Sequence, residues 1–228
     1  MNEKYIEDFN TALNIYQKDY SHDDLIKFLK NGSIVEKQTS AIKLDKIFSK
    51  DEAKIFISNL VGCDGKIREA ISFRLPEYVK ENPEFFVNYT DIFLEAIIDI
   101  NGNICRNTIT ALKYLENFET FSKPFCEKLL EKTYELAKIA KTFDIQDGKY
   151  KINKQVFKLY WYLETISLLI NNCNQGKVLE IVRYTKDIFD YTIREKTAKI
   201  LTKLENSSEI SQIKDKLKND QNYYVRRL

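Results

Sequence analysis

Residues 67–75, with the sequence IREAISFRL, decide the fold because closely similar stretches return later in the chain. A small or β-branched apolar residue, an arginine and apolar residues at helical spacing appear again in CRNTITALKYL at 105–115 and in IREKTAKILTKL at 193–204. A fainter copy, VEKQTSAIKL, occupies 35–44 and carries Glu36 in the place of the arginine. Self-similarity of this kind is the sequence signature of a repeat architecture.

The arginines of these copies indicate the length of the repeat. Each follows an apolar residue and has Asp or Asn shortly upstream; the pairs are Arg68 with Asp64, Arg106 with Asn103, Arg194 with Asp190, and Arg226 with Asn222. Starting from Glu36, the successive intervals are 32, 38, 88 and 32 residues. Because 88 is twice 44, one divergent repeat fits between the second and third arginines, and the helix predicted for 152–170 fills it.

Local signals predict helices along the whole chain. Apolar residues recur every three or four positions, as in residues 67–75, which is the spacing of one helix face. A serine followed three residues later by an acid marks helix starts at Ser21, Ser33 and Ser49. Glycine (6) and proline (3) are scarce, whereas all-β folds need turn residues at short intervals. About twelve helices are expected after an N-terminal one, with a kink at Pro76.

These motifs resemble the HEAT-repeat family, in which helical hairpins stack into a superhelix. The resemblance covers the chain from about Ser21 onward. It implies an all-α, right-handed α-α superhelix (solenoid) of about five to six hairpins in a single domain over 1–228. The expected repeats span 21–48, 49–81, 82–119, 122–171, 175–205 and 207–228. The last range is short, so either the protein ends on a truncated cap or the sequence is a fragment, and a natural end is the preferred expectation.

In that family the second helix of each hairpin begins with an Asp-containing turn and a Val-Arg pair, which join neighbouring repeats. The resemblance therefore implies a structural ladder made of Asp64, Arg68, Arg106, Asp190, Arg194 and Arg226. We expect the arginines to pair with Asp64, Asp190 and nearby carbonyl groups, since the planar guanidinium satisfies several acceptors at once. Phosphate binding by these arginines is the alternative. Glu36 departs from the pattern, and the fourth repeat lacks both motif residues.

Composition and charge exclude several classes of protein. The net charge is +2, with 36 Lys and Arg against 34 Asp and Glu. Residues 1–114 carry −3 and residues 115–228 carry +5, which falls short of the basic stripe of a dedicated nucleic-acid binder. No segment approaches the roughly 20 apolar residues of a membrane span. The N-terminal residues lack the apolar centre of a signal peptide, and the four cysteines form no C-x-x-C pair. A cytoplasmic location is expected.

The sequence offers few groups for catalysis or metal binding. His22 is the only histidine, and its place beside two aspartates at a helix start indicates a surface residue and not a base. We find no P-loop, dinucleotide fingerprint or nucleophile elbow. Residues around Gly148 resemble a fragment of a calcium loop but lack its alternating acids. We therefore predict no catalytic residue, no metal site and no cofactor.

Partner-binding residues are expected on the second helices, which would line the concave face of the solenoid. The aromatic run Tyr160-Trp161-Tyr162 cannot face one side of a helix, so at least one ring should lie near the surface. In the competing interpretation, Phe157 and Trp161 are core residues flanked by the tyrosines. Lysines on the second helices are further candidates for an acidic partner; they are Lys113, Lys158 and Lys199. Tyr223-Tyr224 with Arg226-Arg227 form a second exposed candidate.

Three functions compete on this evidence. The preferred one is a non-catalytic scaffold or adaptor that binds a protein or peptide partner, because stacked repeats provide an extended surface. The second is a nucleic-acid-binding protein similar to the HEAT-like DNA glycosylases, for which Trp161 and Glu164 are the only nearby aromatic and carboxylate pair. The third is a lyase or maturation factor similar to the phycobilin-lyase repeat proteins. The near-neutral charge counts against the second.

Overall fold

The computed structural model of the protein describes residues 3–140 and 153–227. The predicted all-α class is confirmed: these residues form thirteen α-helices and two short 3-10 helices, and no strand occurs among them. The chain divides into two compact units, Met1–Phe121 and Ser122–Leu228, which are described separately. The segment around Gly148, with its resemblance to a calcium loop, lies outside the described residues.

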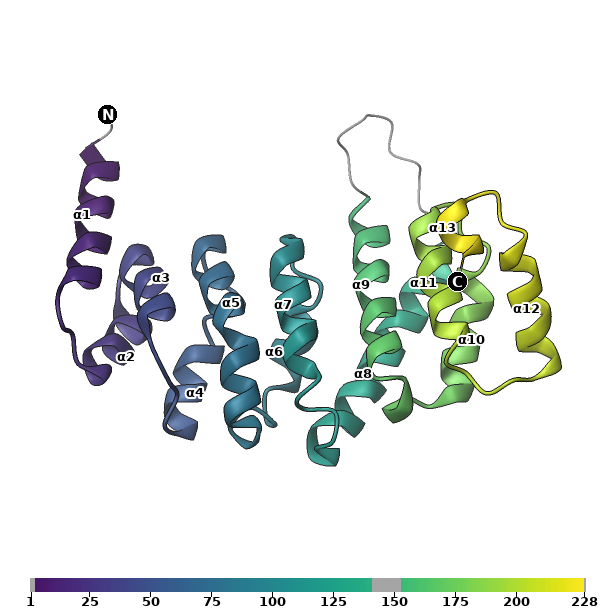
Figure 1. The fold of residues 1–228 in the computed structure, drawn as a ribbon, viewed down its shortest axis with the longest axis horizontal. Helices are drawn as coiled ribbons and strands as arrows, with labels where there is room; N and C mark the ends of the chain where they lie inside the picture. Colours follow the sequence, from purple (N-terminus) through teal and green to yellow (C-terminus); the bar gives the residue numbers. More distant parts are fainter. Residues whose placement is uncertain (1–2, 141–152, 228) are drawn as a thin grey trace. The chain divides into compact units, whose positions relative to one another are not determined.

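The first unit consists of two layers of helices (Figure 1). In chain order the helices are α1 (Glu3–Gln17), α2 (His22–Asn31), α3 (Ile34–Lys43), α4 (Lys50–Ile57), α5 (Gly65–Glu81), η1 (Pro83–Phe85), α6 (Thr90–Ala96) and α7 (Gly102–Leu112). The odd-numbered helices α1, α3, α5 and α7 lie side by side, each in contact with the next. Helices α2 and α4 contact each other in the second layer. Helices α3, α5 and α7 are the second helices of the predicted hairpins, whereas α1 precedes the first predicted repeat.

The second unit repeats this alternation. Its helices are α8 (Glu119–Ile139), α9 (Lys154–Leu168), η3 (Ile170–Asn172), α10 (Gln175–Thr185), α11 (Tyr191–Leu201), α12 (Ser208–Lys218) and α13 (Tyr223–Arg226). The odd-numbered helices α9, α11 and α13 again contact one another in order, while α10 and α12 pack against α11. Helix α8 begins three residues before the range predicted for its repeat and runs through Pro124 as a helix-interior residue.

Short polar side chains start most of these helices, as the sequence predicts. Ser21, Ser49 and Asp64 each accept a backbone amide of the first turn, and Ser33 forms a full capping box with Glu36. Such caps satisfy amides that have no partner inside the helix. In the second unit asparagine, aspartate and serine take the same role at α9, α10, α11, α12 and α13. Helix α5 continues through Pro76 as one element.

Large apolar side chains between the two layers form the core of each unit. In the first unit the rings of Phe56 and Tyr78 meet edge to face at 5.0 Å, and those of Phe93 and Phe121 at 5.5 Å. All four rings are fully buried. Burying a side chain of this size is worth about 1.5–3 kcal/mol, so the shared interface between layers holds the hairpins together.

Candidate functional site

The motif arginines Arg68, Arg194 and Arg226 occupy one structural position, four residues after the N-cap of an odd-numbered helix. At this position the side chain turns back over the loop that precedes its own helix. The Nη1 atom of Arg194 donates to the carbonyl oxygens of Ile188 at 2.7 Å and Phe189 at 2.6 Å. Nη1 of Arg68 donates to the carbonyl of Cys63 in the same way.

In Arg68 and Arg194 the other two nitrogens bind a carboxylate from the next repeat. Arg194 donates from Nε and Nη2 to Asp220 at 2.6 and 3.0 Å, and Arg68 donates from the same atoms to Asp99 at 2.7 and 3.4 Å. Each aspartate lies two residues before the N-cap asparagine of the next odd-numbered helix and accepts its backbone amide at 2.8 Å. We call each arginine and aspartate pair a repeat link. Fork-to-carboxylate pairing of this kind is strong and orientationally specific.

The repeat links differ from the expected pairing in their acidic partners. Asp64 and Asp190 do not receive the arginines; each instead caps its own helix, with Oδ1 accepting a backbone amide two residues ahead at 2.8 Å. The carboxylates that pair are little exposed, and the hydrogen bond from Arg194 holds the pKa of Asp220 below its ordinary value despite partial burial. The linking acid therefore comes from the next repeat and not from the arginine's own turn.

Two motif assignments are out of register by one residue. Counting four residues from the N-cap Asn101 reaches Cys105, so Arg106 lies one position further and turns about 100° around the helix. It is exposed, and among the described residues its side chain donates to Asn103 at 3.3 Å and to no aspartate. Counting from Ser33 likewise reaches Lys37 and not Glu36. Lys37 donates to the side-chain oxygen of Asn59 at 3.1 Å.

A further set of cations, which the sequence analysis missed, caps the C-terminal ends of neighbouring odd-numbered helices. Lys43 near the end of α3 donates to the carbonyls of Ile15 and Lys18 at the end of α1, at 2.7 and 2.6 Å. Arg74 of α5 reaches the Leu44 carbonyl at 3.0 Å, where α3 ends. In the second unit Lys203 donates to the Ser167 carbonyl in the last turn of α9. Positive charge at a helix C-terminus also interacts favourably with the helix dipole. Because each cation and the carbonyl that it caps belong to neighbouring odd-numbered helices, these contacts join those helices.

The aromatic run on α9 lies mostly inside the second unit. Trp161 and Tyr162 are only 8% and 6% exposed, while Tyr160 is half-buried. Tyr160 packs edge to face against Trp161 at 5.0 Å. Tyr160 also contacts Lys196 of α11, whose ammonium lies 4.6 Å from the ring centre. Of the three aromatic candidates, Tyr160 is therefore the one that retains surface for a partner.

Glu164 joins α9 to α11 through two lysines. Its carboxylate contacts Lys196 and Lys199, each at 2.9 Å. Burial alone would raise the pKa of Glu164, but the hydrogen bonds from the lysines outweigh it and lower that pKa. Burial likewise works to lower the pKa of Lys196, and the hydrogen bond to Glu164 reverses the direction. Lys199 is thus held by an acid of its own chain.

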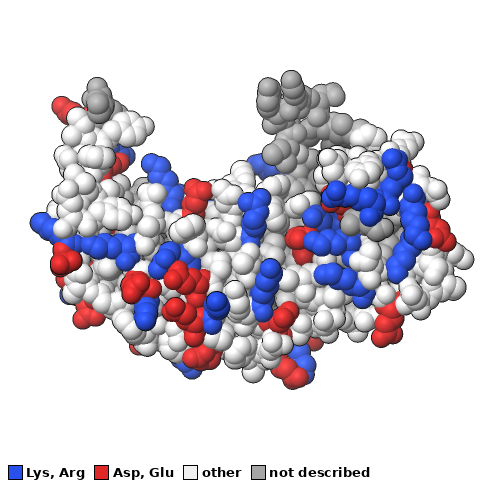
Figure 2. Space-filling model, viewed as in Figure 1, with Lys and Arg blue, Asp and Glu red and all other residues white. Residues whose placement is uncertain are grey.

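The remaining lysine candidates lie on the odd-numbered helices. Lys158 is half-exposed on α9, and Lys113 is exposed at the C-cap of α7. Figure 2 shows lysine and arginine side chains gathered over the helices of the second unit.

His22 contacts Glu52 at 3.0 Å and lies against the ring of Phe48. In the described ranges, no group of three His, Cys, Asp or Glu side chains has the geometry of a metal site.

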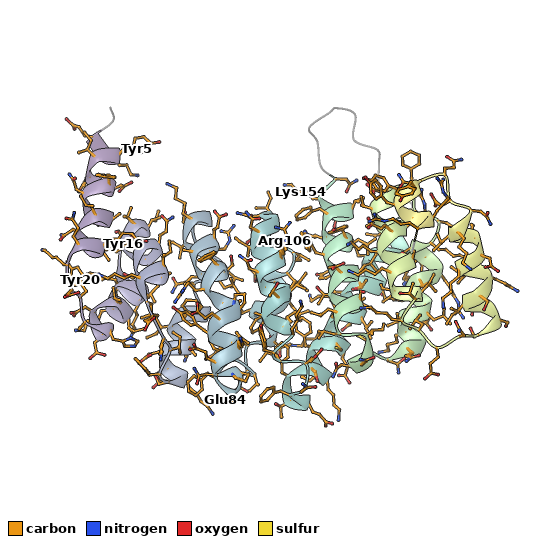
Figure 3. The ribbon with its side chains drawn as sticks, viewed as in Figure 1. Tyr5, Tyr16, Tyr20, Glu84, Arg106 and Lys154 are labelled. Atoms are coloured by element: carbon orange, nitrogen blue, oxygen red, sulfur yellow. The ribbon has the colours of Figure 1, made fainter. Side chains whose placement is uncertain are left out.

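Exposed hydrophobic side chains are concentrated on one layer. Twelve large hydrophobic residues within the described α-helices are exposed, and eleven of them belong to odd-numbered helices. They are Tyr5, Ile6, Phe9, Leu13, Tyr16, Ile34, Ile42, Phe73, Tyr191, Tyr223 and Tyr224. Figure 3 shows Tyr5 and Tyr16 projecting from α1. We call the outer surface of the odd-numbered helices in each unit the odd-helix surface.

Comparison with known proteins supports the fold and gives no function. No family model and no curated protein matches the chain. Two engineered proteins solved by the Northeast Structural Genomics Consortium align with a TM-score of 0.51. The first is 12% identical and covers 92% of this chain and 93% of its own, and the second is 17% identical and covers 92% and 95%.

The chain has a helical-repeat fold. The predicted resemblance to HEAT-like and armadillo-type repeats is confirmed at this level. A designed armadillo repeat protein also aligns, with 13% identity, a TM-score of 0.46, and coverage of 91% of this chain and 96% of the other. Among the described residues, no helix combines the length and apolar character needed to cross a membrane.

Proposed function

We propose that this helical-repeat protein is a non-catalytic scaffold that binds a protein partner on its odd-helix surface. The observation that carries the proposal is the concentration of exposed large hydrophobic residues on the odd-numbered helices. Single exposed apolar residues are common on any protein, but a bias toward one layer of each unit is a property of that layer. Aromatic anchors of this kind dominate binding energy at protein interfaces.

The first unit supplies the most apolar part of the odd-helix surface. On α1, Tyr5, Phe9 and Tyr16 are exposed, while Ile15 on the same helix is buried. Helix α1 is thus apolar on more than the side it needs for packing against α3. On α5, Phe73 is 66% exposed although its helix contacts odd-numbered neighbours on both sides. Burial of these rings by a partner would remove apolar area from water, which favours association.

In the second unit, the part of this surface on α9 and α11 is amphipathic. Tyr160 is half-buried, packs edge to face against Trp161 and has the ammonium of Lys196 over its ring. Lys196 is held by Glu164 and cannot rearrange without breaking that ion pair. A ring held in one position loses little conformational entropy on binding, so Tyr160 is suited to be an anchor.

The glycosylase-like alternative finds less support in this geometry. Such a site needs an accessible aromatic ring beside a carboxylate that is free to act. Trp161 is 8% exposed, and the Glu164 carboxylate is held by two ammonium groups. Nucleic-acid binding by the basic face of the second unit is therefore not proposed. The nuclease treatment in the capture experiment tests for it.

Affinity capture from native lysate, with and without nuclease, tests the scaffold function. The variants Phe73→Ala and Tyr160→Ala change the odd-helix surface. Two matched controls change comparable rings elsewhere: Phe48→Ala, which is 64% exposed between α3 and α4, and Tyr184→Ala, half-buried on α10. A specific protein that survives nuclease should be lost with the first pair and retained with the second. Equal recovery with all four variants, or recovery that needs nucleic acid, would refute the proposal.

A further inference from the structure

Two cysteines that are 47 residues apart in the sequence meet inside the second unit. Cys126 lies in the N-terminal part of α8, and Cys173 lies in the loop between η3 and α10. A hydrogen bond joins their two sulfur atoms, and the side chains are only 2% and 7% exposed. The same two segments share a second contact, because Asn172 donates to the hydroxyl of Ser122, one turn before Cys126, at 3.3 Å.

The position of Cys173 allows its sulfur to approach Cys126 still more closely. Its backbone is extended and lies outside the helices on either side, and the adjacent residues Asn172 and Asn174 are exposed. A disulfide brings its sulfur atoms about 2.0 Å apart, which is closer than any hydrogen bond. A loop residue can make that shift without moving a helix, and local opening of a loop admits a molecule as small as hydrogen peroxide.

The hydrogen bond between the sulfurs also prepares one of them for oxidation. It lowers the pKa of the Cys126 thiol against the opposing effect of burial, and it raises the pKa of Cys173. Cys126 is therefore the thiol that ionises first, and the thiolate is the form that attacks a peroxide. In contrast, burial raises the pKa of Cys105 to about 12, and that thiol donates to the backbone carbonyl of Asp99 at 3.1 Å.

The cysteine pair lies where the second unit lacks a repeat link. Four residues after the N-cap of α9 the chain has Phe157 in place of arginine, and two residues before the N-cap of α11 it has Ile188 in place of aspartate. Cys126 belongs to the hairpin of α8 and α9, and Cys173 belongs to the loop that leads into the hairpin of α10 and α11. A bond between the two sulfurs would therefore join these hairpins at a junction that has no arginine fork.

We propose that Cys126 and Cys173 form a redox-modification site, at which a peroxide closes a disulfide that braces these two hairpins in the folded protein. The Cys126 thiolate attacks one oxygen of hydrogen peroxide and breaks the O–O bond, which gives a sulfenic acid and a hydroxide that takes up the proton released by Cys126. The Cys173 sulfur then attacks the sulfenic sulfur, the S–O bond breaks, and the departing hydroxide leaves as water with the Cys173 proton. Two thiols and one peroxide thus give one disulfide and two water molecules, and a dithiol reduces the disulfide again. This chemistry does not depend on the proposed partner-binding surface.

Peptide mapping of the wild-type chain tests the site without any substitution. The reduced, folded protein is treated with a small excess of hydrogen peroxide, the remaining thiols are blocked with N-ethylmaleimide, and the unreduced digest is examined by mass spectrometry. We expect a linked pair of peptides that contain Cys126 and Cys173, and dithiothreitol should separate them. Because this measurement needs no variant, a substitution that impairs folding cannot affect it.

The melting temperature, followed by circular dichroism, tests whether the disulfide braces the hairpins. The oxidised chain should melt about 5–10 °C above the reduced chain, because a crosslink that closes a long loop constrains the unfolded state. Cys173→Ala should abolish both the linked peptides and this shift, whereas the control Cys105→Ala, which removes another buried thiol, should keep both. Absence of the linkage in the folded protein, linkage of either residue to Cys63 or Cys105 instead, or an oxidised chain that melts no higher than the reduced one overturns the inference.

Discussion

Replacing Arg194 with Ala measures how strongly a repeat link holds two repeats together. The side chains of Arg194 and Asp220 are 17% and 9% exposed, and removing the arginine deletes two hydrogen bonds to the carboxylate and two to carbonyls. Hydrogen bonds to charged groups contribute about 1.5–3 kcal/mol, and an abandoned buried charge adds to the loss. Asp220 still accepts the amide of Asn222, which relieves part of that cost. We therefore expect the free energy of unfolding to fall by about 2–3 kcal/mol.

Urea denaturation followed by far-ultraviolet circular dichroism gives this difference. Arg183→Ala is the matched control, because Arg183 holds Glu209 with the same two atoms at 2.7 and 2.9 Å on the open surface. Exposed pairs contribute little, so the control should unfold close to the wild-type midpoint. Asp220→Asn added to Arg194→Ala should recover part of the stability, because the unpaired charge is removed. Equal midpoints for Arg194→Ala and Arg183→Ala would refute the reasoning.

The pH dependence of the same difference has a definite sign. Arg194 lowers the pKa of Asp220 in the folded state, so the link is fully present above the unfolded pKa of aspartate, about 3.9. Its contribution is lost as the pH falls through the lower folded-state value. The gap in stability between wild type and Arg194→Ala should therefore stay constant near neutral pH and narrow only below about pH 4.

Three other predictions follow from the described contacts. Arg68→Ala should lower the free energy of unfolding by about 2–3 kcal/mol by the same reasoning, while Arg106→Ala should leave the urea midpoint unchanged. Equal effects of the two substitutions would show that Arg106 is wrongly placed outside the position of the linking arginines. Glu164→Gln leaves Lys196, 8% exposed, without a carboxylate and should lower stability by about 2–4 kcal/mol; an unchanged melting temperature would contradict it. With Ellman's reagent at mildly alkaline pH, only the half-exposed Cys63 should react before unfolding, because the other three thiols are buried; fast reaction of more than one thiol in the folded protein would be contrary to this.

The fold was predictable because its signals are local. Serine and aspartate caps such as Ser33 and Asp64 mark helix starts by chemistry that depends on the nearest four residues. Repetition of the motif then supplied the architecture, since a hairpin with an apolar face must stack on a similar neighbour. Register was the weak point: Arg106 follows an apolar residue as Arg68 does, yet only the distance from the N-cap decides which way the side chain points.

A paired signal in the sequence would have found the repeat links. Arginine at the fourth position after an N-cap occurs together with aspartate two residues before the next N-cap, as in Arg68 with Asp99. In α7 and α9 the arginine position holds Cys105 and Phe157. The corresponding aspartate position before the next N-cap holds Lys151 and Ile188 in the sequence, so both halves of the pattern are missing there. The expected partners were sought in the arginine's own turn, because the sequence does not reveal which repeat approaches the fork.

The aromatic run on α9 was harder to interpret for a different reason. Helical periodicity separates one buried face from one exposed face, but α9 packs against α11 and buries seven of its 15 residues, including neighbours in sequence. Trp161 and Tyr162 are both buried although they are adjacent in sequence. Helix α9 is covered by α11, which is distant in the chain, and no local pattern encodes that.

The repeat link also determines how a chain of this kind can change its length. A segment of 32 residues, from the one after Arg194 to Arg226, contains the acceptor for the arginine before it and a new arginine in the same position. Duplicating that segment in tandem would place the copied aspartate beside Arg226 and present the copied arginine at the new end. Growth by whole segments of this kind therefore needs no new type of interface between repeats.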